Sequence, residues 1–266
     1  MSPANILREL KKFPNKLLGQ NFLVDNAAIV DILDAAELGG DDVVVEIGPG
    51  LGSLTWPLTQ VVKRVIAIEA DHEFAHYLRL KKARKLTVVA GDALKIDWTI
   101  DLEGAYKIVA NIPYSITSPL LRKIFLLEKK PELVVLLVQK ELAERITAQE
   151  GKSDRGFLTI LTEASAKATI VRKVPAGSFY PRPRVTSSVI KLEPYEESKM
   201  DLIFWPAVEA GFRHKRQTLA NALNKDLKTP KLKVASFLEG QGLSPLARAQ
   251  ELSFEHWQAL TKKIGK

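Results

Sequence analysis

The chain has 266 residues, of which 46% are hydrophobic and 26% are charged, which is typical of a folded globular protein rather than a disordered one. Lys and Arg number 39 against 31 Asp and Glu, so the formal net charge is +8. This excess of positive charge favours a polyanionic partner such as nucleic acid. The sequence contains no cysteine, which excludes disulfides, thiolate metal sites and cysteine nucleophiles.

Neither a metal site nor a membrane segment is expected. His72 and His76 lie one helical turn apart, but no HExxH pattern surrounds them, so they indicate a solvated helix face. No apolar run approaches the ~20 residues that a helix needs to span a bilayer. The first residues lack the apolar core of a signal peptide. We therefore expect a cytoplasmic protein without a membrane partner.

From about residue 43, short apolar runs alternate with amphipathic stretches. This pattern predicts strands at 43–47, 64–68, 86–90, 107–110 and 133–138, with helices that start near Gly52, after Asp71 and near Ser118. Strands that are apolar throughout and alternate with helices indicate a parallel sheet covered on both faces. Two further strands, 168–174 and 185–192, leave no room for a helix between them and predict an antiparallel hairpin at one sheet edge.

The pattern breaks around residues 194–199. Beyond this point only helical periodicity is present, at 202–211, 212–225, 231–239 and 254–264. The sequence therefore predicts a Rossmann-like, seven-stranded α/β domain over residues 1–197 and a small all-helical domain over residues 198–266.

A glycine-rich segment, 46–52, ends the first predicted strand and opens a helix, where glycines allow a tight turn and close approach of a ligand. Glu69 ends the next strand, where a carboxylate can accept both hydroxyls of a ribose. The GxGxG spacing differs from the GxGxxG of dinucleotide sites, and the preceding acid, Glu46, suits the ammonium group of S-adenosylmethionine. Asp92, after the third strand, can accept from an adenine amine or simply cap a turn. Alternatively, the Glu46 carboxylate can stabilise the glycine-rich loop by accepting hydrogen bonds from the backbone amides of the loop.

The tetrapeptide Asn111-Ile112-Pro113-Tyr114 ends the fourth predicted strand. An exocyclic adenine amine is a poor nucleophile, and two acceptors that hold its N–H groups localise its lone pair. The Asn111 side-chain oxygen supplies one acceptor and a carbonyl near Pro113 the other, while the Tyr114 ring offers a stacking face for an extruded base. Taken in isolation, the segment is equally typical of a loop that ends a strand at Asn-x-Pro, with the tyrosine ring packed in the core.

These motifs resemble the ribosomal RNA adenine dimethyltransferases. The resemblance rests on Gly19-Gln-Asn-Phe-Leu, Glu46-Ile-Gly-Pro-Gly, Asn111-Ile-Pro-Tyr and Phe179-x-Pro-x-Pro, and it covers nearly the whole chain. The segments that start at Phe212 and Ala247 are similar to the bacterial branch that modifies two adjacent adenines near the 3′ end of small-subunit (16S) RNA. The resemblance implies a monomeric enzyme that uses S-adenosylmethionine and acts on RNA of an immature 30S particle.

The resemblance also implies roles for particular residues. The cofactor-binding residues would be Gln20, Asn21, Leu23, Gly48, Glu69, Asp92 and Asn111. The catalytic residues would be Asn111, Pro113, Tyr114 and Phe179, with Phe179 closing over the target base. In isolation, Phe179 reads as a core residue under a proline turn.

A basic segment, Arg213-His214-Lys215-Arg216-Gln217, lies in the predicted helical domain and departs in spacing from the Arg-Arg-Lys cluster expected of the family. It suits either an RNA phosphate contact or a solvated helix face. Three other functions compete with the main hypothesis. They are methylation of large-subunit RNA of the antibiotic-resistance type, a non-catalytic ribosome assembly factor, and an NAD-dependent reductase, which the loop spacing disfavours.

Overall fold

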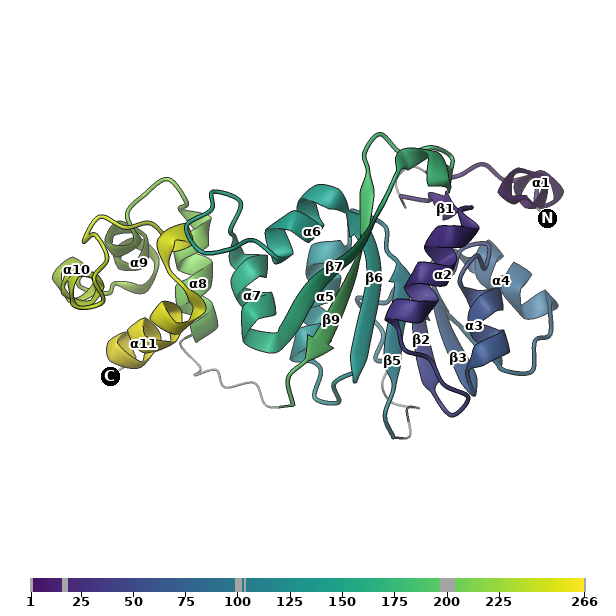
Figure 1. Cartoon of the computed structure of the whole chain (residues 1–266), viewed down its shortest axis with the longest axis horizontal. Coiled ribbons are helices and arrows are strands. Elements are labelled where there is room, and N and C mark those ends of the chain that lie inside the picture. Colours follow the sequence, from purple (N-terminus) through teal and green to yellow (C-terminus); the bar gives the residue numbers. More distant parts are fainter. Residues whose placement is uncertain (1, 16–18, 99–101, 103, 197–203, 266) are drawn as a thin grey trace. The chain divides into compact units, whose positions relative to one another are not determined.

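Seven strands form one sheet in the order β4-β3-β2-β5-β6-β9-β7 (Figure 1). The computed structural model describes residues 2–15, 19–98, 102, 104–196 and 204–265. The strands of the sheet are β2 (Val43–Ile47), β3 (Arg64–Glu69), β4 (Leu86–Ala90), β5 (Lys107–Asn111), β6 (Leu133–Gln139), β7 (Ala166–Val174) and β9 (Ser187–Pro194). Strands β2 to β6 pair in parallel, and β9 pairs with β6 in antiparallel orientation. The predicted seven-stranded α/β architecture is therefore confirmed.

Helices α2 and α3 cover one face of this sheet. The helices of this part are α1 (Pro3–Glu9), α2 (Asn26–Ala35), α3 (Thr55–Val61), α4 (His72–Leu80), α5 (Thr117–Leu126) and α6 (Lys140–Ile146). Fully buried Ile32 and Leu58, from α2 and α3, belong to one apolar cluster with Val44, Val109 and Val135 of the strands. The three valines point to the same face of the sheet because every second residue of a strand lies on the same face. Removing this apolar surface from water holds the helices on the sheet.

A second, two-stranded sheet joins distant parts of the sequence. Strand β1 (Phe22–Leu23) pairs antiparallel with β8 (Phe179–Tyr180), which follows a short 3-10 turn, η1 (Ala176–Ser178). The Ser178 hydroxyl also donates to Asp25, whose carboxylate caps α2. This pairing brings together two of the motifs on which the family resemblance rests, Gly19–Leu23 and Phe179–Pro183.

The chain divides by its internal contacts into two units. The first comprises residues up to Ala143 and Ala168–Pro194, and the second comprises Glu144–Lys167 and the residues from Tyr195 onward. The predicted domain boundary near residue 198 lies outside the described residues. The segment before β7, assigned to the first domain from its sequence, groups with the C-terminal helices. There Arg155, with only 1% of its surface exposed, pairs with Glu163 and donates to the Leu252 carbonyl.

The second unit is a cluster of helices around a buried tryptophan. Its helices are α7 (Phe157–Ser165), α8 (Phe204–Arg213), α9 (Leu219–Leu227), α10 (Lys231–Gly240) and α11 (Phe254–Ile264), with a 3-10 turn η2 (Ala249–Glu251). Trp257 is fully buried in a core with Phe204, Leu219, Leu223 and Leu238. None of the helices in the described residues is both long enough and apolar enough to cross a bilayer.

The single helix predicted over 212–225 is wrong. Helix α8 continues to Arg213, and a turn over the basic segment precedes α9. The Thr218 hydroxyl accepts from the Asn221 backbone amide and caps α9, so the new helix starts directly after this residue. Phe212 and Leu219 therefore belong to different helices.

Gly211→Ala should destabilise the protein although alanine is the better helix former. A methyl group at Gly211 in α8 would lie 2.6 Å from a ring carbon of Trp257 and 3.1 Å from Leu219. We expect a loss of about 1–3 kcal/mol in the free energy of unfolding because the core cannot accommodate the extra atom. Gly240→Ala is the matched control, since nothing lies within 4 Å of its added methyl group. Equal denaturation midpoints for both variants would contradict the packing argument.

Candidate active site

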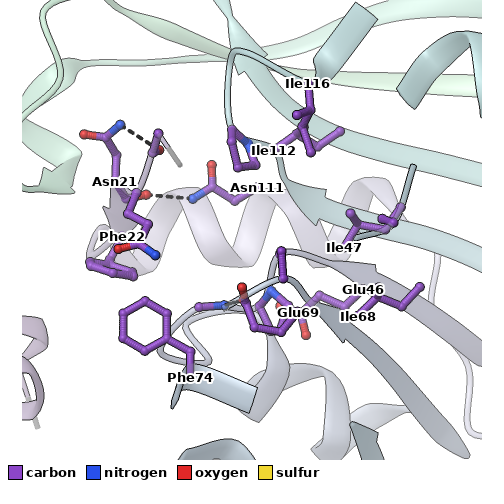
Figure 2. Close-up of a pocket in the computed structure, with 18 of the residues that line it drawn as sticks. Asn21, Phe22, Glu46, Ile47, Ile68, Glu69, Phe74, Asn111, Ile112 and Ile116 are labelled. Carbon is purple, nitrogen blue, oxygen red and sulfur yellow. Dashed lines mark hydrogen bonds between the residues drawn. The ribbon is translucent and has the colours of Figure 1, made fainter. Parts of the chain in front are cut away.

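A cavity of about 240 Å³ lies at the carboxyl ends of four parallel strands (Figure 2). Gly48 follows β2, Glu69 ends β3, Asp92 follows β4 and Asn111 ends β5, and all four residues line the cavity. The strand order reverses between β2 and β5, and an open α/β sheet binds its ligands in the crevice at such a switch point. The topology thus explains why residues from four separate sequence motifs meet.

Three motifs converge on Pro113. A Cβ atom at Gly48 would lie 3.7 Å from Pro113 Cδ, and one at Gly19 would lie 3.1 Å from Pro113 Cβ. Both glycines have positive φ angles, +70° and +62°, a region that other residues rarely adopt. Glycine is therefore required at both positions by conformation, and at Gly19 also by the close approach of the proline.

Glu69 is held by backbone amides on both of its carboxylate oxygens. Oε2 accepts from Gly50 N at 2.8 Å, and Oε1 accepts from Asp71 N at 2.9 Å. Burial raises the pKa of Glu69, although these amide hydrogen bonds oppose the shift. Each oxygen has a second lone pair, so the oriented carboxylate can still accept from a ligand in the cavity.

Glu46 presents a buried carboxylate to the same cavity. Only 1% of its surface is exposed, and its Oε2 has no hydrogen-bond partner among the described residues. Burial raises its pKa to about 8, and the nearby carboxylate of Glu69 adds to the shift. An unpaired buried carboxyl oxygen is costly, which points to a ligand group with N–H donors at this place.

Asp92 is more accessible than these two acids. Its Oδ1 accepts from Leu94 N at 2.9 Å, so it caps the turn that follows β4, as the simpler sequence interpretation held. Its side chain is 40% exposed and lines the cavity as well. A carboxylate has enough lone pairs to cap a turn and to accept from a ligand.

The Asn111 side chain is oriented by the N-terminal segment. Its Nδ2 donates to the Asn21 carbonyl at 3.0 Å, and Asn21 Nδ2 donates to the Gly19 carbonyl at 3.1 Å (Figure 2). A carbonyl oxygen can only accept a hydrogen bond, so the Asn111 atom that faces it must be the side-chain nitrogen. The orientation of the Asn111 side-chain amide is therefore fixed. The Asn111 oxygen accepts no hydrogen bond from a described residue and remains available as an acceptor in the cavity.

Tyr114 and Pro113 are held in different ways. The Tyr114 hydroxyl lies 2.8 Å from the hydroxyl of Ser187, which is fully buried at the start of β9. Burial raises the pKa of Tyr114, so its hydroxyl stays neutral. The Pro113 carbonyl already accepts from Ile116 N and Thr117 Oγ1, whereas no described residue donates to the Ile112 carbonyl. The free carbonyl of this loop is therefore that of Ile112.

The structure brings most, but not all, of the predicted site residues together. The cavity is lined by Gln20, Asn21, Gly48, Glu69, Asp92, Asn111, Pro113 and Tyr114. Leu23 and Phe179 do not line it, because they pair across the β1–β8 ladder and are buried in the apolar cluster between α2, α3 and the sheet. Sequence reasoning missed Phe22 and Phe74, which line the cavity and pack edge to face with ring centroids 5.7 Å apart.

The basic segment of the second unit is partly neutralised. Asp226 on α9 accepts from Arg213 at 2.7 Å and lies 3.0 Å from His214 Nε2. Lys215 and Arg216 are exposed in the turn between α8 and α9, and no described residue forms an ion pair with them. The free positive charge of this segment therefore belongs to Lys215 and Arg216.

Comparison with known proteins places the chain among RNA methyltransferases. The family described as ribosomal RNA adenine dimethylase matches residues 12–266. A protein named ribosomal RNA small subunit methyltransferase A from Clostridium botulinum is 38% identical over 272 residues, which cover 99% of this chain and 98% of the relative. One of the same name from Clostridium perfringens is 39% identical, covering 95% of this chain and 91% of the relative.

Two solved structures share the fold over most of the chain. A dimethyladenosine transferase from Plasmodium falciparum has a TM-score of 0.74 at 28% identity, covering 92% of this chain and 98% of the other. The 23S rRNA methyltransferase ErmE has a TM-score of 0.72 at 27% identity, covering 92% of this chain and all of the other. Both similarities extend well beyond the sheet that carries the cavity.

Replacing Glu46 by Gln should flatten the pH dependence of stability. The pKa of Glu46 is about 8 in the folded protein and near 4.5 in the unfolded chain, so between these values the folded state holds a proton that the unfolded state has lost. This contribution to stability is complete below pH ~4.5 and is lost as the pH rises through ~8. In that window wild type should lose up to about 1.4 kcal/mol per pH unit relative to Glu46→Gln. Parallel pH profiles in chemical denaturation would show that Glu46 is ionised in the fold.

Proposed function

Because the chain belongs to the ribosomal RNA adenine dimethylase family, we propose that it dimethylates the N6 amines of two adjacent adenosines near the 3′ end of small-subunit (16S) ribosomal RNA. The family uses S-adenosylmethionine as methyl donor. The small-subunit assignment is supported by relatives named for that substrate, whose similarity spans 99% of this chain, including the C-terminal helices. The observation that carries the chemistry is the Asn111 side chain, whose amide nitrogen is anchored on Asn21 so that its oxygen is free in the cavity.

The hydrogen-bond acceptors that line the cavity fit S-adenosylmethionine. Glu46, with its unpartnered oxygen, suits the ammonium group, and Glu69 suits the ribose hydroxyls. Asp92 would accept from the adenine amine of the cofactor, and Gly48 allows its close approach. Gln20 and Asn21 line the same cavity and would contribute to the cofactor site, whereas Leu23 does not line it and its side chain is turned into the core. When bound, the cofactor supplies an electrophilic methyl group on its sulfonium sulfur.

The target adenine amine would be held by two acceptors, the Asn111 side-chain oxygen and the Ile112 carbonyl. These two hydrogen bonds favour tetrahedral geometry at the adenine N6 nitrogen and localise its lone pair for in-line attack on the methyl group. The Tyr114 ring, fixed through its hydroxyl on Ser187, would stack on the extruded base. No strong base is required, because the amine loses its proton after attack. Phe179 would have to move out of the apolar cluster to close over the base, and this role stays a prediction.

The protein would work in the cytoplasm as a monomer on an immature 30S particle. A family that modifies ribosomal RNA must meet its substrate where ribosomal subunits form. Apart from Leu23 and Phe179, the groups assigned to cofactor and base line one cavity of a single chain, which supports a monomer. The exposed pair Lys215 and Arg216 would contact RNA phosphates.

Nucleoside mass spectrometry tests the proposed substrate. Purified small or large ribosomal subunits from cells that lack the modification would be incubated with the protein and S-adenosylmethionine. We expect N6,N6-dimethyladenosine in small-subunit RNA alone. Dimethyladenosine only in large-subunit RNA would support the antibiotic-resistance type of activity, which the similarity to ErmE keeps as the alternative. No methylation of either subunit would indicate a non-catalytic assembly factor.

Asn111→Ala should lower kcat by roughly 10²–10³, as expected for loss of one oriented transition-state partner. RNA affinity should barely change, because phosphate contacts dominate it. Tyr114→Phe keeps the stacking face and loses only the hydrogen bond to Ser187, so its effect should be mild. Single-turnover methylation at saturating cofactor separates the two variants. Near wild-type methylation by a folded Asn111→Ala protein would refute the mechanism.

Neutralising Lys215 and Arg216 together, as Lys215→Gln and Arg216→Gln, should weaken RNA binding. The slope of log K against log[salt] should fall by about 0.7–0.9 for each lost phosphate contact. Arg213→Gln is the matched control, since this side chain is already paired with Asp226. Filter binding at several salt concentrations measures the slopes. If the double variant keeps the wild-type slope, these residues form only a solvated surface.

A further inference from the structure

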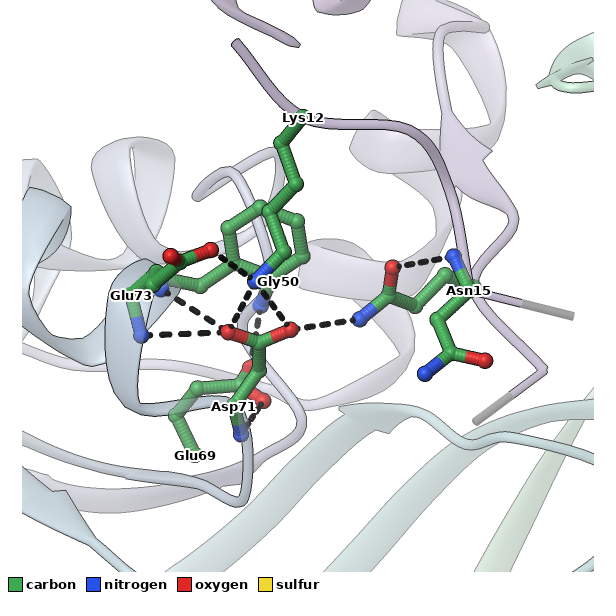
Figure 3. Close-up of polar contacts among 8 residues, drawn as sticks. Lys12, Asn15, Gly50, Glu69, Asp71 and Glu73 are labelled. Atoms are coloured by element: carbon green, nitrogen blue, oxygen red, sulfur yellow. Dashed lines mark hydrogen bonds and ion pairs between the residues drawn. The ribbon is translucent and has the colours of Figure 1, made fainter. Parts of the chain in front are cut away.

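Lys12 binds two carboxylates beside the cavity although it does not line it. Its Nζ lies 2.5 and 2.7 Å from the two Asp71 oxygens and 2.5 Å from Glu73 Oε2 (Figure 3). The Lys12 side chain is 19% exposed and that of Asp71 is 8% exposed, so this ion pair is partly shielded from water. The neighbouring Lys11 is exposed instead.

Asp71 connects Lys12 to both walls of the cavity. Its Oδ2 accepts from Gln20 Nε2 at 3.1 Å, and its own backbone amide donates to Glu69 Oε1 at 2.9 Å. Gln20 is fixed further by Asn15, whose backbone amide donates to Gln20 Oε1 at 2.8 Å. Although burial opposes the shift, the hydrogen bonds from Lys12 and Gln20 lower the pKa of Asp71, so it is ionised at neutral pH.

An aromatic pair lies under the same cation. Lys12 Nζ is 4.6 Å from the Phe74 ring centroid, and Phe74 packs edge to face on Phe22. Gln20 and Phe22 line the cavity from the N-terminal side, while Glu69 and Phe74 line it from the side of β3 and α4. The Lys12 ammonium group and the Asp71 carboxylate, which also binds Gln20, thus join two walls of the cavity that are about fifty residues apart in sequence.

We infer that Lys12 is a positioning residue for the cofactor. Through Asp71 it holds Gln20 and Phe22 against Glu69 and Phe74, so that the two walls of the cavity are in place before S-adenosylmethionine binds. This inference deepens the proposed function and depends on the cavity being the cofactor site. Lys12 touches neither the target amine nor the groups assigned to grip it, so it acts on binding and not on methyl transfer.

The sign of the effect distinguishes positioning from simple electrostatics. S-adenosylmethionine carries a net positive charge at neutral pH, because its sulfonium and ammonium groups outweigh its one carboxylate. Removing a nearby lysine would strengthen its binding if only long-range charge mattered. Loss of a preformed wall would weaken it, because binding would then have to order that wall.

Calorimetric titration of the protein with S-adenosylmethionine, and separately with S-adenosylhomocysteine, which lacks the sulfonium charge and has no net charge, tests the inference. Lys12→Met should weaken the binding of both compounds by about threefold to tenfold. Lys12→Arg keeps the ion pair and should restore affinity. Lys11→Met removes the same charge from the adjacent exposed position and should bind as wild type does. In turnover, Lys12→Met should raise KM for the cofactor and leave kcat at saturating cofactor unchanged.

Asp71→Asn provides a second test that does not depend on the folding of Lys12→Met. Asp71→Asn retains an oxygen that caps α4 but loses the ion pair, and it should weaken binding to the same extent. Combining it with Lys12→Met should add nothing, whereas additive losses would show that the two residues act separately.

The outcomes separate this inference from the proposed function. Glu69→Ala, titrated in parallel, should lose affinity whether or not Lys12 positions the wall. Wild-type affinity in Lys12→Met with a clear loss in Glu69→Ala would overturn the role of Lys12 alone. Wild-type affinity in both would overturn the cofactor site itself. A loss of kcat in Lys12→Met without a change in KM would also contradict a positioning role.

Discussion

The hydrogen bond from the Asn111 side chain to the Asn21 carbonyl joins segments 90 residues apart and determines what the cavity can do. It fixes the amide orientation, leaves the Asn111 oxygen as a free acceptor, and holds the Gly19–Asn21 segment beside the sheet. The β1–β8 pairing and the approach of Gly19 to Pro113 depend on the same placement. One neutral contact therefore links the side of the cavity proposed for the cofactor to the side proposed for the target base.

Charge is divided between the cavity and the surface. The chain has a net charge of +8, but Glu46, Glu69 and Asp92 bring carboxylates to the cavity. Acidic groups in a low-dielectric site favour a cationic methyl donor, while exposed Lys and Arg favour a polyanionic RNA. The raised pKa of Glu46 follows mainly from its burial, and the nearby Glu69 carboxylate adds to the shift.

The strands of the sheet were predictable because each is a continuous apolar run bounded by turn residues. The cap at Asp71 was predictable from its position before an amphipathic helix, and its hydrogen bonds to Glu73 and Phe74 confirm it. The helix over 212–225 was wrong because apolar periodicity continues across the turn that Thr218 closes. No helix was predicted over Phe157–Ser165, although a polar segment that ends in Gly156 precedes it. Its grouping with the C-terminal helices depends on the buried Arg155, which pairs with Glu163 and donates to the Leu252 carbonyl.

The sequence by itself determined the fold class, the family and most of the cavity residues, because motifs that end parallel strands must meet at one edge of the sheet. Only the tertiary structure decided that Leu23 and Phe179 are buried away from the cavity, that Arg213 is neutralised by Asp226, and that Lys12 reaches Asp71. These are contacts between residues far apart in the chain, or across a turn. Local periodicity and spacing carry no information about them, because their geometry depends on how whole elements pack.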